Sequence, residues 1–305
     1  MNKSTKNFPI FQDKLILLQT FNDPNVKTLA TRTTVNKELS PLKLKQKRIG
    51  FVPTMGALHE GHLELIRQAK EQCDVVICSI FVNPKQFNDK KDFQIYPRTI
   101  ESDKAKLEAA DCDFLYLPDY EDVYQSYTPI EFEFSGLDAV MEGKYRPGHF
   151  RGVADVVYCL FDAVKPDDAF FGIKDYQQVM IIKSMVKQTG LEVNIIPCET
   201  IRSEKGLALS SRNNLLNEEN LEKAVRIYET MQFVKAQFTQ EKFASLKQQA
   251  IDLLEETGDF EVDYLEITDA ETLQPAVEKE KGKSYRIFVA AYIQGVRLID
   301  NMGLS

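Results

Sequence analysis

Short apolar runs alternate with amphipathic stretches up to about residue 200. The run DVVICSIFV at 74–82 is almost entirely apolar, which is typical of a strand buried on both faces of a parallel sheet. Apolar residues at helical spacing instead mark segments such as 150–164. Strands are predicted over 47–52, 74–82, 113–117, 168–172 and 191–197, and helices over 61–73, 99–110, 150–164 and 174–188. This alternation predicts an α/β fold with a doubly wound sheet.

The pattern changes after Arg212. Two charged amphipathic helices are predicted over 218–238 and 241–256, followed by antiparallel strands over 260–268, 284–292 and 296–301. We therefore expect two domains: a nucleotide-binding domain over 1–200 and a smaller α+β domain over 201–305. The segment 83–98 is expected to be a polar loop. The polar segment 1–46 is assigned no element and no role.

Composition narrows the class of protein. The net charge of -8 argues against broad binding to nucleic acid or to a membrane surface, although it allows a small anionic ligand. No apolar run approaches the ~20 residues of a membrane helix, and the N-terminus lacks the apolar region of a signal peptide. The 5 cysteines form no C-x-x-C pair and are expected to be free thiols. We expect a soluble protein of the reducing cytoplasm.

The 3 histidines lie beside or near glycine in loop-like settings, as H-E-G-H at 59–62 and R-P-G-H-F at 146–150. One interpretation makes His59 and His62 zinc ligands, with His149 as the third. The other is a phosphate site at a strand–turn–helix junction, where glycines admit the ligand and the helix N-terminus supplies free N–H groups. We favour the phosphate site and predict no metal ligands, because no cysteine or carboxylate cluster completes a metal site. A Walker A loop and a G-x-G-x-x-G fingerprint are both absent after this strand.

Three further segments carry candidate chemistry, each with a plainer alternative. In FGIKDYQQ at 171–178, Lys174 could neutralise phosphate, and Asp175 could hold a ribose hydroxyl or simply cap the helix. GLALSSRN at 206–213 could be a mobile phosphate clamp or an ordinary Ser/Asn cap. In NPKQF at 83–87, Gln86 could bind a hydroxyl or carboxylate, or lie in a surface loop.

Together these segments resemble the pantoate–β-alanine ligase family. The matching stretches, in order, are PTMGALHEGH (53–62), FVNPKQF (81–87), YPRT (96–99), MEGKYRPGHFRGV (141–153), FGIKDYQQ (171–178) and LALSSRN (207–213). The resemblance implies a Rossmann-like nucleotide-binding domain with a C-terminal lid, and the HxGH signature shared with nucleotidyltransferases and class I aminoacyl-tRNA synthetases. It implies that ATP and pantoate give pantoyl adenylate and pyrophosphate, and that β-alanine then gives pantothenate and AMP. Magnesium accompanying ATP and a homodimer are implied in the same way.

The resemblance also implies roles for individual residues. Gln86 and Gln178 match the glutamines that bind pantoate, and the predicted catalytic residues are His62, His59, Lys174 and Arg212. The predicted ATP-binding residues are Met55, Gly56, Ala57, Leu58, His59, Glu60, Gly61, His62, Gly172, Ile173, Lys174, Asp175, Ile201, Leu209, Ser210, Ser211 and Arg212. Within that set, Asp175 is expected to hold the ribose. Asp103 is a candidate to reach magnesium through water, and Tyr96, Arg146 and His149 also fall on family-like positions.

The chain departs from the family pattern at Ile173, where a glutamate is usual, and in a longer, more polar segment over 22–47. If that glutamate only faces solvent, its replacement changes nothing; if it supports Lys174, the affinity for ATP differs. Two rival functions remain: a related HxGH nucleotidyltransferase acting on another small substrate, and a catalytically silent nucleotide sensor. The first does not need the Gln86–Gln178 pair, and the second would be expected to lose the catalytic residues that this chain keeps.

Overall fold

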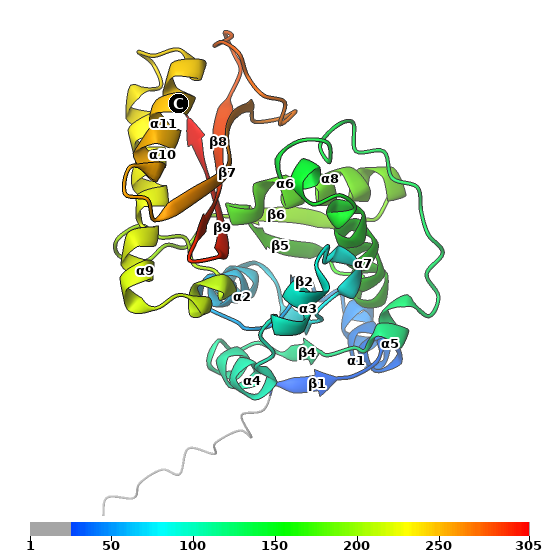
Figure 1. Cartoon of the computed structure of the whole chain (residues 1–305). Coiled ribbons are helices and arrows are strands. Elements are labelled where there is room, and N and C mark those ends of the chain that lie inside the picture. The colour runs from blue at the N-terminus through cyan, green and yellow to red at the C-terminus, as the bar shows by residue number, and fades with distance from the viewer. Residues whose placement is uncertain (1–25, 305) are drawn as a thin grey trace, which may run out of the picture.

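The computed structural model describes residues 26–304, which build two sheets with their helices (Figure 1). Within that range the first sheet has six strands, all parallel, in the order β1-β4-β3-β2-β5-β6. The strands are β1 Lys27–Leu29, β2 Ile49–Thr54, β3 Val75–Ile80, β4 Phe114–Tyr116, β5 Asp168–Gly172 and β6 Asn194–Cys198. The predicted Rossmann-like doubly wound parallel sheet is confirmed.

Helices cover both faces of this sheet. The face packed by Ile77 and Phe51 is covered by α1 Arg32–Leu44, α7 His149–Val164 and α8 Tyr176–Thr189. The opposite face, packed by Val76 and Cys78, is covered by α2 Glu60–Gln72 and α4 Ile100–Ala109. Successive residues of a strand point to opposite faces, so a strand covered on both sides must be apolar throughout. All six residues of β3 are buried accordingly, as the continuous apolar run predicts.

The predicted strands and helices are present in the structure, but several of their bounds differ from the predicted ones. The strand at 168–172 has the predicted bounds, whereas the helix expected from Lys174 begins at Tyr176, after a 3-10 turn. The expected polar loop 83–98 and the stretch after β4 contain short helices. These are η1 Pro84–Gln86, α3 Lys90–Ile95, α5 Tyr120–Tyr124 and α6 Met141–Tyr145, whereas the 3-10 turn before Tyr176 is η2 Ile173–Asp175.

The segment 1–46, left without elements by the sequence, contains β1 and α1 in its described part. Only Val35 and Leu39 of α1 are buried, so the helix has too narrow an apolar face to stand out as a periodic pattern. Thr31 begins this helix with a capping box to Thr34. Strand β1 is three residues long and lies at the edge of the sheet, where little alternation can be seen.

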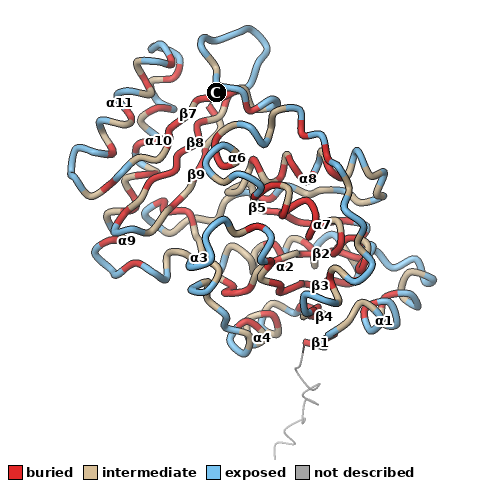
Figure 2. Tube along the Cα trace, turned by 45° about the vertical axis from the view of Figure 1, so that its right-hand side comes forward, coloured by how far each residue is buried: buried red, intermediate tan, exposed pale blue. Residues whose placement is uncertain are grey.

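The second sheet lies in the C-terminal part of the chain and is antiparallel, in the order β7-β8-β9. Buried residues follow its strands and the helices beside them, in the red segments of Figure 2. The helix predicted over 218–238 is interrupted at Val225, without a glycine or proline to announce the break. The elements are η3 Ser211–Leu215, α9 Glu218–Ala224, α10 Arg226–Gln237, α11 Phe243–Glu255, β7 Phe260–Asp269, β8 Tyr285–Ile293 and β9 Val296–Leu304.

The strand order creates a switch point between β2 and β5. The chain runs from β2 to β3 and β4 on one side, and β5 and β6 continue on the other side of β2. Ligands of open α/β sheets bind at the carboxyl ends of strands at such a point. The predicted phosphate segments follow β2 and β5 directly, so the topology places them side by side. We propose a domain boundary just after β6, near residue 200.

Two further properties concern the whole described chain. Nowhere between residues 26 and 304 does the fold contain a helix with the length and apolar character needed to span a membrane. All of the cysteines are free thiols, and only Cys73 is not fully buried.

Candidate active site

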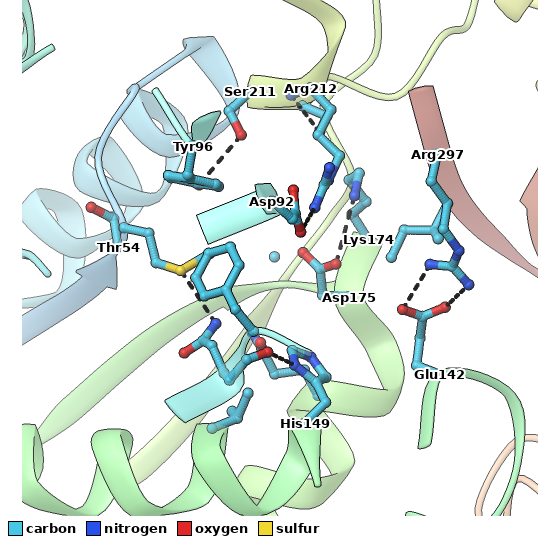
Figure 3. A pocket seen from close by; sticks show the side chains of 18 of the residues that line it. Thr54, Asp92, Tyr96, Glu142, His149, Lys174, Asp175, Ser211, Arg212 and Arg297 are labelled. Carbon is cyan, nitrogen blue, oxygen red and sulfur yellow. Dashed lines mark hydrogen bonds and ion pairs between the residues drawn. The ribbon is translucent and has the colours of Figure 1, made fainter. Parts of the chain in front are cut away.

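A cavity of about 860 Å³ lies between the carboxyl edge of the parallel sheet and the C-terminal domain. Residues that follow β2, β3, β5 and β6 form one wall, and residues of η3 and β9 form the other (Figure 3). The structure thus brings together segments that are far apart in the chain. The predicted site residues that line it are Met55, His59, Gly61, His62, Gln86, Gly172, Lys174, Asp175, Gln178, Ile201, Leu209, Ser210, Ser211 and Arg212.

Five predicted ATP-binding residues are not among the described residues lining the cavity: Gly56, Ala57, Leu58, Glu60 and Ile173. Gly56, Ala57 and Leu58 are buried behind the wall, and Glu60 is exposed and paired with Arg67. Their assignment as ATP contacts therefore stays a prediction.

Asp103 holds the loop after β2 in shape. Its carboxylate accepts hydrogen bonds from the Ala57 N–H at 3.0 Å, the Leu58 N–H at 2.8 Å and the Thr99 hydroxyl at 3.1 Å. Gly56 has φ +82°, and an added Cβ would lie 3.2 Å from Asp103 Oδ2, so both the conformation and the close approach require glycine. Asp103 is fully buried, which contradicts its suggested place near magnesium.

At the start of α2, fewer N–H groups are free than the sequence led us to expect. The Gly61 N–H donates to His59 Nδ1 at 3.2 Å, and the His59 N–H donates to His62 Nδ1 at 3.4 Å. The two histidines form a capping box for α2, so the N–H groups of His59 and Gly61 are satisfied inside the protein. Gly61 is needed because an added Cβ would meet the His59 ring at 2.9 Å.

This capping arrangement determines the tautomer of both imidazoles. Because each Nδ1 accepts a hydrogen bond, the proton of each neutral ring resides on Nε2. Burial, reinforced by the charge of Lys174, lowers the pKa of His59 to about 4. Burial and the neighbouring His59 also hold the pKa of His62 well below its usual value. The ring centroids are 4.1 Å apart, so the cavity wall presents two adjacent neutral N–H donors at physiological pH.

Gln86 is oriented by a chain of hydrogen bonds. Its Oε1 accepts from Asn83 Nδ2 at 3.2 Å, which leaves Nε2 against the Met55 sulfur at 3.2 Å. The Asn83 amide is oriented in turn, because its Oδ1 accepts from the Lys85 N–H and its Nδ2 donates to the Gly152 carbonyl. The surface-loop alternative for Gln86 is wrong, since only 7% of the residue is exposed. The amide N–H₂ is the end available to an anionic or carbonyl ligand.

Tyr124 supports this turn from outside. Its hydroxyl donates to Asn83 Oδ1 at 2.9 Å, and the Lys85 ammonium lies 3.6 Å from its ring centroid. A cation held over an aromatic face is attracted by the ring quadrupole. The turn carrying Gln86 is thus anchored at two points.

Arg146 and His149 lie on the same side of the cavity as Gln86. His149 Nδ1 donates to the Gln86 carbonyl at 2.8 Å, and Arg146 Nη1 donates to His149 Nε2 at 3.2 Å. Burial and the adjacent Arg146 charge lower the pKa of His149 to about 4. His149 is therefore a neutral link between the turn that carries Gln86 and the partly buried guanidinium of Arg146. The described residues gather no group of three potential metal ligands, so the zinc interpretation lacks a ligand set.

Lys174 and Asp175 project into the cavity from the turn η2 (Figure 3). Lys174 Nζ lies 3.6 Å from Asp175 Oδ1, and only 17% of the lysine side chain is exposed. Asp175 precedes α8, but its side chain makes no capping hydrogen bond within the described structure. The capping alternative for Asp175 is therefore wrong, and the carboxylate remains available to a ligand.

The loop after Ile201 supplies the opposite wall. The Leu209 N–H donates to the Ile201 carbonyl at 2.9 Å, which closes a short hairpin. Ser210 Oγ accepts from the Arg212 N–H at 3.2 Å and caps η3, so the cap alternative holds for this hydroxyl. Ser211 and Arg212 reach across to Tyr96 and Asp92 of the first domain, at 3.4 Å and 2.8 Å (Figure 3).

Sequence reasoning missed the contacts that join the two domains beside the cavity. Arg297 of β9 donates to both carboxylate oxygens of Glu142, at 3.0 Å and 2.6 Å, and lies 2.8 Å from Asp263 (Figure 3). Burial acts to raise the pKa of Glu142, but the Arg297 bonds and charge outweigh it and leave that pKa below its usual value. Glu142 lies in a stretch that matches the family. No local signal in β9 announces its partner, 155 positions away.

Comparison with known proteins points in one direction. The family model described as pantoate-beta-alanine ligase matches residues 27–303. The pantothenate synthetase of Thermodesulfovibrio yellowstonii is 46% identical over 275 residues, 88% of this chain and 96% of the relative. That of Christiangramia forsetii is 44% identical over 269 residues, 88% of this chain and 95% of the relative.

Solved structures agree. Pantothenate synthetase from Thermus thermophilus has a TM-score of 0.83 and 39% identity, covering 90% of this chain and 98% of that one. Pantoate-beta-alanine ligase from Francisella tularensis, complexed with beta-gamma ATP and beta-alanine, has a TM-score of 0.74 and 38% identity, covering 91% and 97%. The family match, these relatives and the shared fold show that the chain belongs to the pantoate–β-alanine ligase family and is an ATP-dependent ligase.

Proposed function

We propose that this one cavity performs both steps of the ligase reaction. In the first step, a carboxylate oxygen of pantoate attacks the α-phosphorus of ATP, and the bond to pyrophosphate breaks. In the second step, the amine of β-alanine attacks the acyl carbon of pantoyl adenylate, loses a proton and displaces AMP. The observation that carries this proposal is the placement of the histidine pair, Lys174, Arg212 and the two glutamines around one cavity.

His59 and His62 serve the phosphates as hydrogen-bond donors. Their neutral Nε2–H groups donate to phosphate oxygens whose charge grows as pyrophosphate departs. Lys174 and Arg212 compensate that charge from the two domains. The nucleophile belongs to the substrate, so the protein's contribution is alignment and charge stabilisation.

Pantoate, the acid substrate, is bound next to these phosphate-binding residues. Gln86 presents its N–H₂ end to the cavity, which suits an anionic carboxylate, and Gln178 lines the same space. The wall from α7 is aliphatic and is formed by Val153, Val156, Val157 and Leu160. Pantoate carries two methyl groups on one carbon, and an aliphatic wall favours their burial.

The nucleoside and the metal complete the proposal. Asp175 holds a ribose hydroxyl, and the backbone near Ile201 contacts the adenine. Magnesium accompanying ATP would be held mainly by the substrate phosphates and would offset their charge beside Lys174 and Arg212. Asp103 takes no part, because its oxygens are committed to the loop.

The C-terminal domain is proposed to act as a lid that keeps water from the acyl adenylate. A homodimer and a cytoplasmic location remain predictions. The comparisons lend no support to a nucleotidyltransferase acting on another substrate.

The decisive assay measures AMP formation by the full chain with ATP, pantoate and β-alanine, and with each omitted in turn. AMP is expected only when all three are present, and pyrophosphate release is expected with ATP and pantoate alone. Equal pyrophosphate release with an unrelated small acid in place of pantoate would overturn the proposal.

A further inference from the structure

Asn301, near the end of β9, lies against the turn that carries Lys174. The residue is 3% exposed and belongs to the C-terminal domain, whereas η2 belongs to the first domain. Asn301 Nδ2 donates to the Ile173 carbonyl at 2.9 Å and to the Lys174 carbonyl at 2.7 Å. One side chain therefore holds two successive carbonyls across the domain boundary.

The orientation of this amide is unambiguous. Asn301 Oδ1 accepts from Arg286, and a guanidinium can only donate, while the two backbone carbonyls can only accept. Both N–H bonds and the oxygen of the amide are thus engaged. The Arg286 guanidinium also lies 4.2 Å from the ring centroid of Tyr176, the first residue of α8. Two neighbouring residues of the C-terminal sheet together hold the start of α8.

The turn has little support of its own. Three-residue 3-10 segments have poor hydrogen-bond geometry, and neither Gly172 nor Asp175 supplies a side-chain cap within the described chain. Ile173 has no polar group in its side chain with which to brace the turn. The position of the Lys174 backbone therefore depends on the bonds from Asn301.

We infer that Asn301 is a positioning residue for Lys174, which it holds in place from the C-terminal domain. This inference rests on the proposed role of Lys174 at the ATP phosphates. Arg297, on the same strand, ties the strand to Glu142 on the other side of the cavity. The placement of the C-terminal domain and the placement of the phosphate lysine are thereby coupled through β9.

The test uses the full chain with Asn301→Ala and the nearly isosteric Asn301→Asp, which lacks the amide donors. Pyrophosphate release is measured while ATP and pantoate are varied separately. Loss of the two bonds is expected to lower kcat/KM for ATP about 5- to 30-fold, and more for Asn301→Asp than for Asn301→Ala. KM for pantoate is expected to stay within about twofold, since Gln86 lies on η1 and Gln178 is held by the backbone hydrogen bonds of α8, and neither receives a bond from Asn301.

Val234→Ala is the matched control, because Val234 is fully buried in the same domain, on α10. Val234→Ala should lower the melting temperature without changing the ratio of kcat/KM for ATP to kcat/KM for pantoate. The inference would be overturned if Asn301→Ala lowered kcat/KM for ATP and for pantoate equally, or if the variant behaved like the control.

A double-mutant cycle with Lys174→Met separates the inference from the proposed function. If Asn301 acts through Lys174, Asn301→Ala should have little further effect once the ammonium is gone. Full additivity of the two losses in the cycle overturns the positioning role. Wild-type pyrophosphate release by Lys174→Met alone overturns the proposed role of Lys174 instead.

Discussion

Arg212 of η3 is paired with Asp92 of α3 across the mouth of the cavity, with Nη2 2.8 Å from Oδ2. The side chains are 32% and 27% exposed, so water screens the pair and its contribution to stability is small. In the proposed reaction Arg212 must turn to the phosphates, and Asp92 then competes with ATP for the same guanidinium.

Asp92→Ala should therefore lower KM for ATP, by up to about fivefold at low ionic strength, with a smaller change at high salt. Steady-state kinetics at two salt concentrations would measure this. Asp89→Asn is the control, because Asp89 caps the same helix through the Lys91 N–H. A rise in KM for ATP would mean that Asp92 helps to place Arg212 rather than competing for it.

His62→Ala should lower pyrophosphate release with ATP and pantoate about 10²- to 10³-fold, the usual cost of removing one preorganised donor to a developing anion. Binding of pantoate, measured by calorimetry, should change little. Wild-type turnover in this variant would remove His62 from the mechanism.

The same histidines make a prediction for pH. Both folded-state pKa values are depressed, that of His59 to about 4, so the rings stay neutral as the pH falls through 6.5. The rate of pyrophosphate release by the wild type should therefore show no histidine limb between pH 8 and about 5.5.

Folding stability behaves differently, because the unfolded rings take up protons below about pH 6.5 and the folded rings do not. The melting temperature should therefore fall as the pH is lowered from 6.5 to 4. A change in the rate of pyrophosphate release with a midpoint near pH 6.5 would contradict the assignment of the two rings as neutral donors.

Tyr124→Phe tests the hydrogen-bond chain to Gln86. Loss of the hydroxyl leaves Asn83 with one fewer partner, and KM for pantoate should rise about 3- to 10-fold while KM for ATP stays constant. Tyr127→Phe removes the hydroxyl of a neighbouring ring that bonds Asp155 instead, and it should leave both constants unchanged. Equal effects of the two substitutions on pantoate would show that the aromatic cluster acts only through packing.

The Glu142–Arg297 pair is buried between the domains. Removing Arg297 takes away the closer cation of Glu142, which keeps only the Tyr264 hydroxyl and the more distant Arg146, and it also removes the cation beside Asp263. Arg297→Met should reduce the free energy of unfolding by about 3–5 kcal/mol, measured by urea denaturation. The double variant Glu142→Met, Arg297→Met should lose less than the single variant. Equal losses in both would show that Arg297 contributes through its contact with Asp263.

The fold class could be predicted because long, strongly patterned elements carry their own signal. Strand β3 is apolar except for Ser79, since both faces are covered, and α7 shows a wide apolar face. Elements with few buried residues could not be found in this way. Helix α1 buries only Val35 and Leu39, and β1 owes its pairing to β4, far along the chain.

For the site, the residues alone named the candidate groups that the structure gathers around one cavity: the H-E-G-H segment, the Lys174 turn, the Ser–Ser–Arg loop and Gln86. Side-chain type and local spacing suffice for that, because they limit what a group can donate, accept or neutralise. They did not establish how the groups are used. Free N–H groups were expected at α2, but the histidines cap the helix themselves and present their Nε2–H groups instead.

Tertiary structure alone decided the rest, because contact between distant segments follows from topology and not from spacing. Asp103 holds a loop because the start of α4 packs beneath it. Asn301 and Arg297 reach the site because β9 lies along the domain boundary, more than a hundred positions from Ile173 and Glu142. Such partners leave no periodic trace in the local sequence, so only the folded chain shows them.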